Sequence, residues 1–209
     1  METRVDIEPS RESTVGRCSW SEISERMRHY HDTEWGVPQR DDRRLFEYLV
    51  LDTFQAGLSW SIILNKREGF HEAFRGFDPE AVAMMTAKDV DDLCSSPLII
   101  RNRAKIEATV GNATTFLQVA QEFGSFSRYF WRFVNDRPVQ NRWVAESEIP
   151  AQTEESLGMS KDLRKRGFRF VGPTICYAIM QSAGLVNDHV VSCFRHAQVA
   201  HAIERFSDT

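Results

Sequence analysis

Residues 41–57 read DDRRLFEYLVLDTFQAG. Leu45, Leu49 and Asp52 follow one another at i, i+4 and i+7, which is the spacing of one face of an α-helix. Two acidic residues at the start and a glycine at the end are typical helix boundaries. The stretch therefore predicts a helix with both ends marked, and the apolar face of that helix carries one carboxyl group.

The same helical periodicity recurs along the rest of the chain. Further helices are predicted over 58–69, ended by Gly69; from Asp78-Pro79; from a capping box at Thr86–Asp89; over 99–124, ended by Gly124; over the aromatic segment 125–134; and over 156–167 and 173–185. The polar segment 135–156 lacks periodicity and is interpreted as the longest surface connection. Because no run alternates like a strand, the predicted fold class is all-α.

Length and composition limit the kind of protein. The chain has 209 residues, of which 42% are hydrophobic and 27% charged, as in a soluble globular protein of one domain or two small lobes. No apolar run approaches the ~20 residues of a membrane span, and no secretory leader is visible, so we expect a cytoplasmic protein without a membrane partner. The predicted organisation is a disordered extension over 1–16, a folded domain over 17–194 and a tail over 195–209.

Charge is distributed unevenly along the chain. The formal net charge of −4 argues, as an average, against a nucleic-acid partner. However, residues 159–172 carry a local charge of +4 and residues 98–106 carry +3, so the remainder totals −11. We therefore expect two basic segments on an acidic body, which predicts weak contact with DNA through one face only.

Two cysteines and two histidines have spacings that fit a metal site. His189 and Cys193 are four residues apart, so a helix would place them on one face, and Cys18 and His31 form a second pair near the N-terminus. Together they would make a closed Cys2His2 tetrahedron that joins both ends of the chain. On spacing alone the alternative is open: Cys193 as a buried apolar residue, His189 as a satisfied helix-end residue, and His29, His196 and His201 equally available.

Aromatic residues cluster in the sequence around Asp52. The nearby aromatic residues are, in sequence order, Trp20, Tyr30 and Trp35 before Asp52 and Trp60 after it. An ionised carboxylate on an apolar helix face costs several kcal/mol unless hydrogen bonds satisfy it. One interpretation is structural, with Asp52 bonded to a backbone amide and the aromatic residues in the core. The other is a pocket for a flat, electron-poor ring, with aromatic faces around it and a carboxylate at its edge.

A third feature is the basic segment KDLRKRGFRFVGPT, residues 161–174. Two helices separated by a short turn between Gly167 and Gly172 would present backbone amides at a helix N-terminus, beside several basic side chains. Such a run of charge can equally be the solvated face of a helix. Because of the two glycines, phosphate binding and a solvated helix face are equally favoured.

Five motifs together resemble a known family. They are RCSW at 17–20, YHDTEWGVP at 30–38, QAGLSW at 55–60, IIRNRAKI at 99–106 and KRGFRFVGPTICYAIMQSAGLVNDHVVSC at 165–193. In this order they are similar to the DNA-3-methyladenine glycosylase I family. The resemblance implies a two-lobed helical fold like that of the helix-hairpin-helix glycosylases. It also implies excision of 3-methyladenine from alkylated double-stranded DNA by cleavage of the N-glycosidic bond, which leaves an abasic site.

The resemblance also implies roles for individual residues. Cys18, His31, His189 and Cys193 match the family's structural zinc site, which predicts one zinc per chain. Trp20, Tyr30 and Trp60 match its base-binding aromatic residues, and the helix-hairpin-helix element matches 160–184. The DNA-binding residues implied are Gly57 and Leu58 in the loop near the flipped nucleotide, and Lys165, Gly167, Phe168, Gly172 and Thr174 in the hairpin. A monomer is expected.

One position departs from the family pattern. Asp52 stands where the family typically has a glutamate, so the charge is retained while the carboxylate reaches less far by about one carbon–carbon bond. The residue is assigned to base recognition rather than to general-base catalysis, and water is the expected nucleophile, without a lyase step. The substitution leaves an alternative open, an alkylated-DNA-binding protein with altered specificity or without catalysis.

Overall fold

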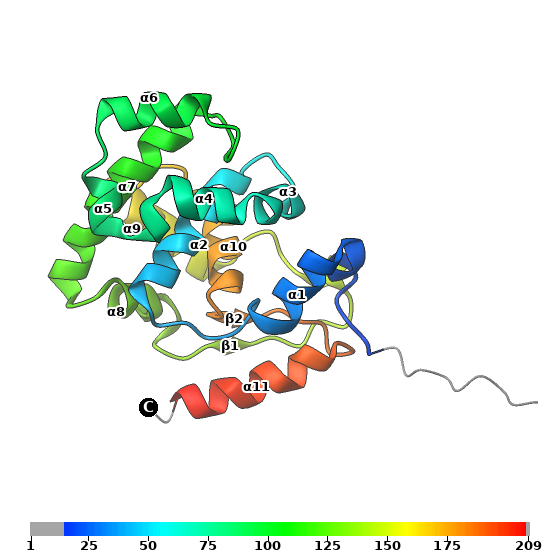
Figure 1. Cartoon of the computed structure of the whole chain (residues 1–209). Coiled ribbons are helices and arrows are strands. Elements are labelled where there is room, and N and C mark those ends of the chain that lie inside the picture. The colour runs from blue at the N-terminus through cyan, green and yellow to red at the C-terminus, as the bar shows by residue number, and fades with distance from the viewer. Residues whose placement is uncertain (1–14, 208–209) are drawn as a thin grey trace, which may run out of the picture.

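The computed structural model describes residues 15–207 and is built almost entirely of helices (Figure 1). In chain order, the first half contains η1 (Ser19–Ile23), α1 (Glu25–Thr33), α2 (Asp42–Gln55), α3 (Trp60–Asn65), α4 (Arg67–Ala73), η2 (Arg75–Phe77), α5 (Pro79–Ala83) and α6 (Ala87–Ser95). The second half contains α7 (Arg103–Phe123), α8 (Phe126–Trp131), η3 (Arg132–Val134), β1 (Val139–Gln140), η4 (Glu146–Glu148), α9 (Glu154–Arg166), α10 (Pro173–Ser182), β2 (Val186–Asn187) and α11 (Phe194–Ser207). The prediction of an all-α fold is confirmed.

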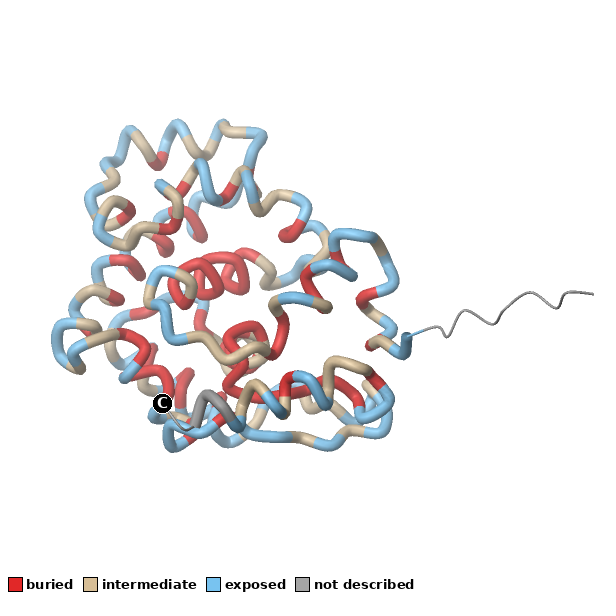
Figure 2. Tube along the Cα trace, turned by 60° about the horizontal axis from the view of Figure 1, so that its bottom comes forward, coloured by how far each residue is buried: buried red, intermediate tan, exposed pale blue. Residues whose placement is uncertain are grey.

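Helix α2, from the stretch 41–57, lies at the centre of the molecule. Every residue from Leu45 to Phe54 is buried, so the helix is covered on all sides and not only along its apolar face (Figure 2). Asp41 caps its N-terminus by accepting a hydrogen bond from the Arg44 amide at 2.9 Å. It packs against α10, α7, α3 and α8. A carboxyl group in the last turns of such a helix is necessarily far from bulk water.

The buried apolar residues form two clusters. The larger one joins α2, α7, α8, α9 and α10, with Phe46, Phe116 and Trp131 among its largest members. The smaller one brings residues 18–35 of the N-terminal segment together with Val190 and Cys193, about 160 residues away along the chain. The smaller cluster therefore ties the two ends of the folded region to each other.

Several predicted helix boundaries are confirmed. Thr86 and Asp89 form the predicted capping box at the start of α6, and Asp78 caps α5 with a proline in the first turn. Helix α7 ends at Gly124, which adopts a left-handed φ of 85°. The aromatic segment forms the short buried helix α8.

Other expectations were wrong in detail. The single helix predicted over 58–69 is two helices, α3 and α4, which meet at Lys66. Gly69 lies inside α4, where a side chain would clash with the carbonyl of Leu98. The segment 135–156 is not purely irregular, since Val139–Gln140 pairs in parallel with Val186–Asn187. These strands are two residues long, too short to show an alternating pattern.

The C-terminal region is more regular than expected. Residues predicted as a tail from 195 onward belong to helix α11, which covers β2 along one side of the molecule (Figure 1). Val199 on this helix is fully buried, and the backbone carbonyl of His196 accepts a hydrogen bond from Asn187 at 3.0 Å. The predicted disordered extension over 1–16 lies, except for its last two residues, outside the described residues. Within 15–207, no helix is long and apolar enough to cross a membrane.

Candidate functional site

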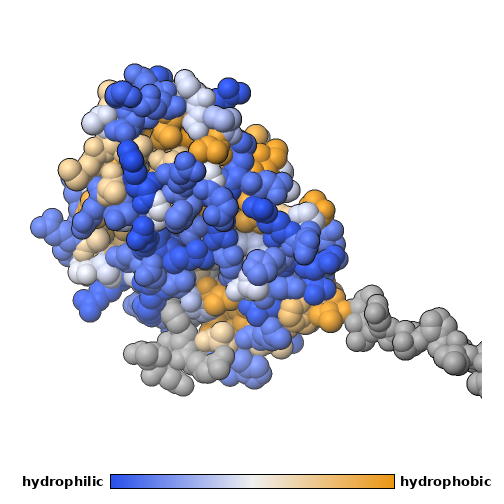
Figure 3. Space-filling view, viewed as in Figure 1, coloured by the Kyte–Doolittle hydropathy of each residue, from blue (hydrophilic) through white to orange (hydrophobic). Residues whose placement is uncertain are grey.

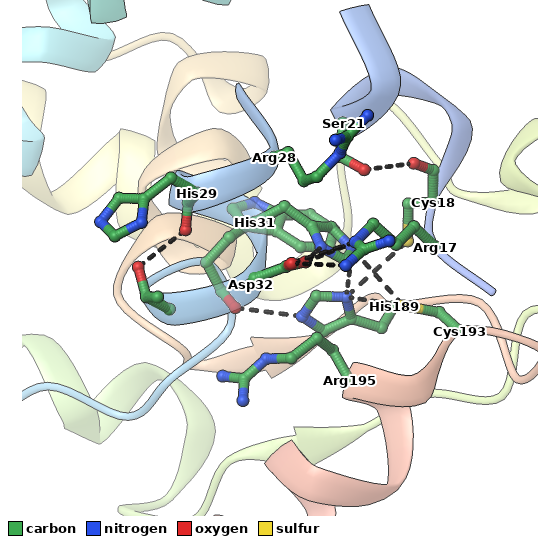
Figure 4. A network of polar contacts seen from close by, with 12 residues as sticks. Arg17, Cys18, Ser21, Arg28, His29, His31, Asp32, His189, Cys193 and Arg195 are labelled. Atoms are coloured by element: carbon green, nitrogen blue, oxygen red, sulfur yellow. Dashed lines mark hydrogen bonds and ion pairs between the residues drawn. The ribbon is translucent and has the colours of Figure 1, made fainter. Parts of the chain in front are cut away.

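Cys18, His31, His189 and Cys193 meet at one point, although they come from opposite ends of the chain (Figure 4). All four are buried, and their ligand atoms lie within 4.8 Å of one another. The Sγ of Cys193 is 3.4 Å from Nε2 of His31 and 3.6 Å from Nδ1 of His189, while Sγ of Cys18 is 3.7 Å from the same Nδ1. We call these four residues the clasp; they could hold a metal ion.

The outer nitrogen of each clasp histidine has its own partner (Figure 4). Nδ1 of His31 is 2.7 Å from the Asp32 carboxylate, which Arg17 pairs with at 3.0 Å. Nε2 of His189 is 3.0 Å from the carbonyl oxygen of Trp35. If these outer nitrogens donate, the inner nitrogens are left as lone-pair acceptors that face the two sulfur atoms. A carboxylate or carbonyl behind each histidine is the usual arrangement around a metal ligand.

The pKa values of the two clasp thiols are shifted in opposite directions. A hydrogen bond from the Cys18 thiol holds the pKa of Cys193 far below its usual value. The pKa of Cys18 is raised by the hydrogen bond that it shares with Cys193 and by burial. At least one thiolate is therefore favoured in the clasp, and a thiolate is the form that binds metals.

A cavity of about 530 Å³ lies beside the clasp and is walled by aromatic residues. Trp20 comes from η1, Tyr30 from α1 and Trp60 from the first position of α3. The ring centroids of Tyr30 and Trp60 are 5.2 Å apart, and those of Trp20 and Tyr30 are 6.4 Å apart. The three aromatic residues predicted to bind a base thus line one cavity, which we call the pocket.

Asp52 forms part of the pocket wall and is buried, with only 1% of its surface exposed. Its Oδ2 atom has no hydrogen-bond partner, while Ser182 bonds the carboxyl group and accepts a hydrogen bond from the Tyr30 hydroxyl at 3.1 Å. Burial raises the pKa of Asp52 to about 8, against the smaller opposing effect of Ser182. Within residues 15–207, the side chain of Ser182 takes the place of the backbone amide that the structural interpretation expected as the partner of this carboxyl group.

A second polar atom in the pocket also lacks a partner. Nε1 of Trp60 is buried without an acceptor. An unpartnered donor and an unpartnered acceptor oxygen in one cavity are costly to the folded protein unless a ligand satisfies them. The pocket therefore suits a flat molecule that can donate and accept hydrogen bonds along its edge.

The ionisable residues of the pocket are all acidic. Among the described residues that line it, Asp52 and Glu146 carry carboxyl groups, and none carries a basic side chain. A cavity with aromatic walls and only acidic ionisable groups favours a cation over a neutral ring of the same shape.

The loop after α2 protrudes from the surface near Trp60. Gly57 has a left-handed φ of 83° with open space around its Cα, and Leu58 is 37% exposed. Lys105, in contrast, is buried, and its ammonium group donates to the carbonyls of Phe54 and Ala56 at 2.9 and 2.8 Å. The lysine fixes the end of α2, so it does not contribute to the basic surface expected from residues 98–106.

The basic hairpin has the predicted form. Helix α9 ends at Gly167, with a φ of 105°, and Gly172 is the N-cap of α10. Lys165 is exposed beside the turn, whereas Arg166 is held by Glu122 and Asp162 and is less available to a partner. The part of the surface seen in Figure 3 is mainly hydrophilic, with hydrophobic residues in small patches.

Two further hairpin residues have different surroundings, and only the first of them is buried. Phe168 is only 3% exposed, and its ring centroid is 6.2 Å from that of Phe126 in the core. Thr174, in the first turn of α10, lines the pocket. The exposed aromatic side chain of the turn is Phe170, which has a left-handed φ of 58°.

A protein-family model described as methyladenine glycosylase matches residues 20–196, most of the chain. The chain belongs to the methyladenine glycosylase family. It is 49% identical over 177 residues to DNA-3-methyladenine glycosylase 1 of Escherichia coli strain K12, a match that covers 85% of this chain and 95% of that protein.

Solved structures of the methyladenine glycosylase family have the same fold. A crystal structure of 3-methyladenine DNA glycosylase I matches with a TM-score of 0.84 and 45% identity, over 86% of this chain and 98% of the other. The Staphylococcus aureus enzyme, solved to explain its recognition of 3-methyladenine, matches with a TM-score of 0.82 and 38% identity, over 85% and 95% of the two chains.

Sequence reasoning missed part of the pocket of this family member. Tyr177, Gln181 and Ser182 line it from α10, and Glu146 lines it from η4. The α10 residues follow at helical spacing and could have been found by placing that helix against α2. Glu146 lies in a segment without periodicity, so no local pattern indicated where its side chain would lie.

Proposed function

We propose that this chain is a monofunctional DNA glycosylase that hydrolyses the N-glycosidic bond of 3-methyladenine in alkylated double-stranded DNA. The products are the free base and an abasic site. The observation that carries the proposal is the pocket itself, with three aromatic walls, an unpartnered Asp52 oxygen and only acidic ionisable groups. Membership of the methyladenine glycosylase family supports it independently.

The chemistry of the substrate explains why such a pocket is sufficient. Methylation at N3 gives adenine a positive charge, so the base can leave as a neutral molecule and needs no strong acid. The enzyme must instead take the nucleotide out of the helix, which costs a few kcal/mol, and select the lesion from normal bases. Aromatic faces in a desolvated pocket favour a cationic ring by about 2 kcal/mol.

In this mechanism Asp52 recognises the edge of the base. The empty pocket favours the protonated carboxyl group, because burial raises the pKa of Asp52 to about 8. A cationic base with N–H donors favours the ionised form and supplies the missing partner for Oδ2. Since aspartate is shorter than glutamate by one methylene, contact is made by a shifted base or through a bridging water. The Nε1 donor of Trp60 is available to an acceptor on the base.

The clasp is assigned to structural zinc, one ion per chain. With bonds of about 2.3 Å to sulfur and about 2.0 Å to nitrogen, the edges of a zinc tetrahedron are about 3.3–3.8 Å long. Three S···N separations of 3.4–3.7 Å and the N···N separation of 3.2 Å between His189 and His31 agree with these edges. Four protein ligands leave no open position, so the ion supplies stability and no catalytic chemistry.

DNA is bound through one face, by the hairpin and the loop after α2. Lys165 and the backbone amides between Gly167 and Gly172 are assigned to the phosphates, and Gly57 and Leu58 to the gap left by the flipped nucleotide. Phe168 and Thr174 are assigned other roles, the first supporting the hairpin from the core and the second lining the pocket from an exposed position. Action as a monomer in the cytoplasm stays a prediction.

The test is release of free 3-methyladenine from methylated duplex DNA by the purified protein. We expect stoichiometric abasic sites that remain uncleaved until alkali is added, as for hydrolysis without a lyase step. Saturable binding of the lesion without release at any enzyme concentration would instead support a non-catalytic binding protein, the alternative that family membership does not favour.

A further inference from the structure

Glu146 is a second carboxylate in the pocket, and it lies at a different depth from Asp52. Asp52 is 1% exposed, whereas Glu146 is half-buried and its hydrogen bonds lie at the surface. Both residues line the same cavity. The pocket therefore has one carboxyl group in its interior and one at its mouth.

The carboxylate of Glu146 is held in place by the segment that carries Trp20. The backbone N–H of Ser19 donates to Oε1, and the Ser19 hydroxyl donates to Oε2 at 2.7 Å. Within the described part of the chain, no basic side chain forms an ion pair with Glu146. Each carboxylate oxygen retains acceptor capacity beyond its one bond to Ser19. The charge is thus fixed in direction but not neutralised by a partner.

The charge on the substrate moves during the reaction. When the bond between C1′ and the base nitrogen breaks, its electron pair goes to the base, which leaves neutral, and the positive charge passes to C1′ and the ring oxygen of the deoxyribose. Water then adds to C1′ and releases a proton to solvent. A base that enters the pocket first leaves its sugar at the mouth, so the charge moves away from Asp52 and toward Glu146.

We propose that Glu146 is a catalytic residue that stabilises the positive charge on the deoxyribose at the mouth of the pocket. This inference rests on the glycosylase function proposed above. A fixed negative charge placed where positive charge develops lowers the barrier without reorganising during the reaction. Asp52 then selects the cationic base in the bound state, and Glu146 acts on the step that breaks the bond.

The experiment compares Glu146→Gln with the wild type and with a matched control, Glu148→Gln. Glu148 lies in the same helical turn and accepts hydrogen bonds from the amides of Val144 and Ala145, but it does not line the pocket. Both changes remove one negative charge and keep the side chain's size. Two quantities are measured: the single-turnover rate of 3-methyladenine release from duplex DNA, and the Kd of the free base by tryptophan fluorescence.

We expect Glu146→Gln to slow the single-turnover step about tenfold, equivalent to ~1.4 kcal/mol, while the Kd of free 3-methyladenine changes less than about twofold. Glu148→Gln should change neither quantity by more than about twofold. An unchanged rate in Glu146→Gln overturns the inference. An equal loss of rate and of base binding also overturns it, since Glu146 would then only hold the pocket together. An equal effect of Glu148→Gln overturns it as well. If the wild-type protein releases no base, the proposed glycosylase function itself is contradicted, which is a different outcome from a failure of the inference about Glu146.

Discussion

The clasp and the pocket lie side by side, yet they differ in whether their buried polar atoms have hydrogen-bond partners. His31 and Tyr30 are neighbours on α1, and both are buried, one in each region. Both clasp histidines have a hydrogen-bond partner behind them, whereas the pocket leaves Oδ2 of Asp52 and Nε1 of Trp60 without any. Satisfied buried polar groups stabilise a fold, and unsatisfied ones cost stability until a ligand binds.

The contrast is clearest between two aspartates. Asp188, next to a clasp histidine and fully buried, accepts four hydrogen bonds at 2.6–2.8 Å, from Asn141, Trp143, Tyr177 and Gln181. Asp52 is equally buried and lacks a partner for one oxygen. The two aspartates therefore have the same burial and differ in the number of their hydrogen-bond partners.

The largest effect is expected in the clasp. Removing the metal with a chelator, or replacing Cys193 with alanine, should lower Tm by more than about 10 °C, because a structural metal site contributes directly to folding. Thermal unfolding by circular dichroism, together with metal analysis of the purified protein, measures this. Cys94→Ala, at a half-buried cysteine of α6 outside the clasp, is the control and should change Tm little. Protein that is free of metal and keeps its Tm would contradict the assignment.

The two aspartates should respond differently to the same change. Asp188→Asn replaces one carboxylate oxygen, which accepts two hydrogen bonds, by an NH2 group that faces the same two donors. We therefore expect a loss of about 3 kcal/mol in the free energy of unfolding. Asp52→Asn removes a costly buried carboxyl group, so stability should stay the same or rise by ~1 kcal/mol, while base excision falls about a hundredfold. Urea unfolding and single-turnover excision measure the two quantities.

The opposite pattern would remove the distinction between the two regions. If Asp52→Asn destabilised the protein as much as Asp188→Asn, Oδ2 of Asp52 would have to be satisfied within the fold. If Asp188→Asn left stability unchanged but reduced excision, the carboxylate beside the clasp would belong to the binding machinery.

A smaller effect is expected from pH. Because the pKa of Asp52 in the folded state, about 8, lies above the ordinary aspartate value of 3.8, the folded protein holds one more proton than the unfolded chain between these values. Stability should therefore fall as pH rises from about 4 to about 8, and kcat/KM for excision should rise toward about 8 as the carboxyl group ionises. Asp52→Asn should flatten this part of both profiles. Profiles of wild type and variant that run parallel would show that another group titrates.

Much of this arrangement could be predicted from the sequence, for reasons that differ between regions. Helix α2 follows from its local periodicity and end signals, which depend only on neighbouring residues. Spacing alone offered His29, His196 and His201 as alternative ligands in the clasp, and only the fold shows that His31 and His189 meet the two cysteines. Metal ligands from distant segments need three-dimensional information that a linear pattern does not contain.

Other features depended on packing that no local pattern records. The sequence assigned Lys105 to a basic surface, but the folded chain uses its ammonium group to satisfy carbonyls at the end of α2. Glu146 reaches the pocket only because its segment crosses to Ser19, 127 residues away. Gly69 lies inside α4, where a side chain would clash with the backbone carbonyl of Leu98, so this glycine marks a close contact and not a helix end.

The smallest expected effect lies outside both regions, on the hairpin. Lys165 is exposed and forms no ion pair with another described residue. Lys165→Ala should therefore weaken binding to undamaged duplex DNA a few-fold and lower the slope of log K against log salt by about 1. Binding of free 3-methyladenine and Tm should not change, because the residue touches neither pocket nor clasp. Lys88→Ala, on the exposed face of α6, is the control. Fluorescence anisotropy at several salt concentrations measures the slope, and an unchanged slope in Lys165→Ala would mean that this part of the hairpin does not contact the phosphates.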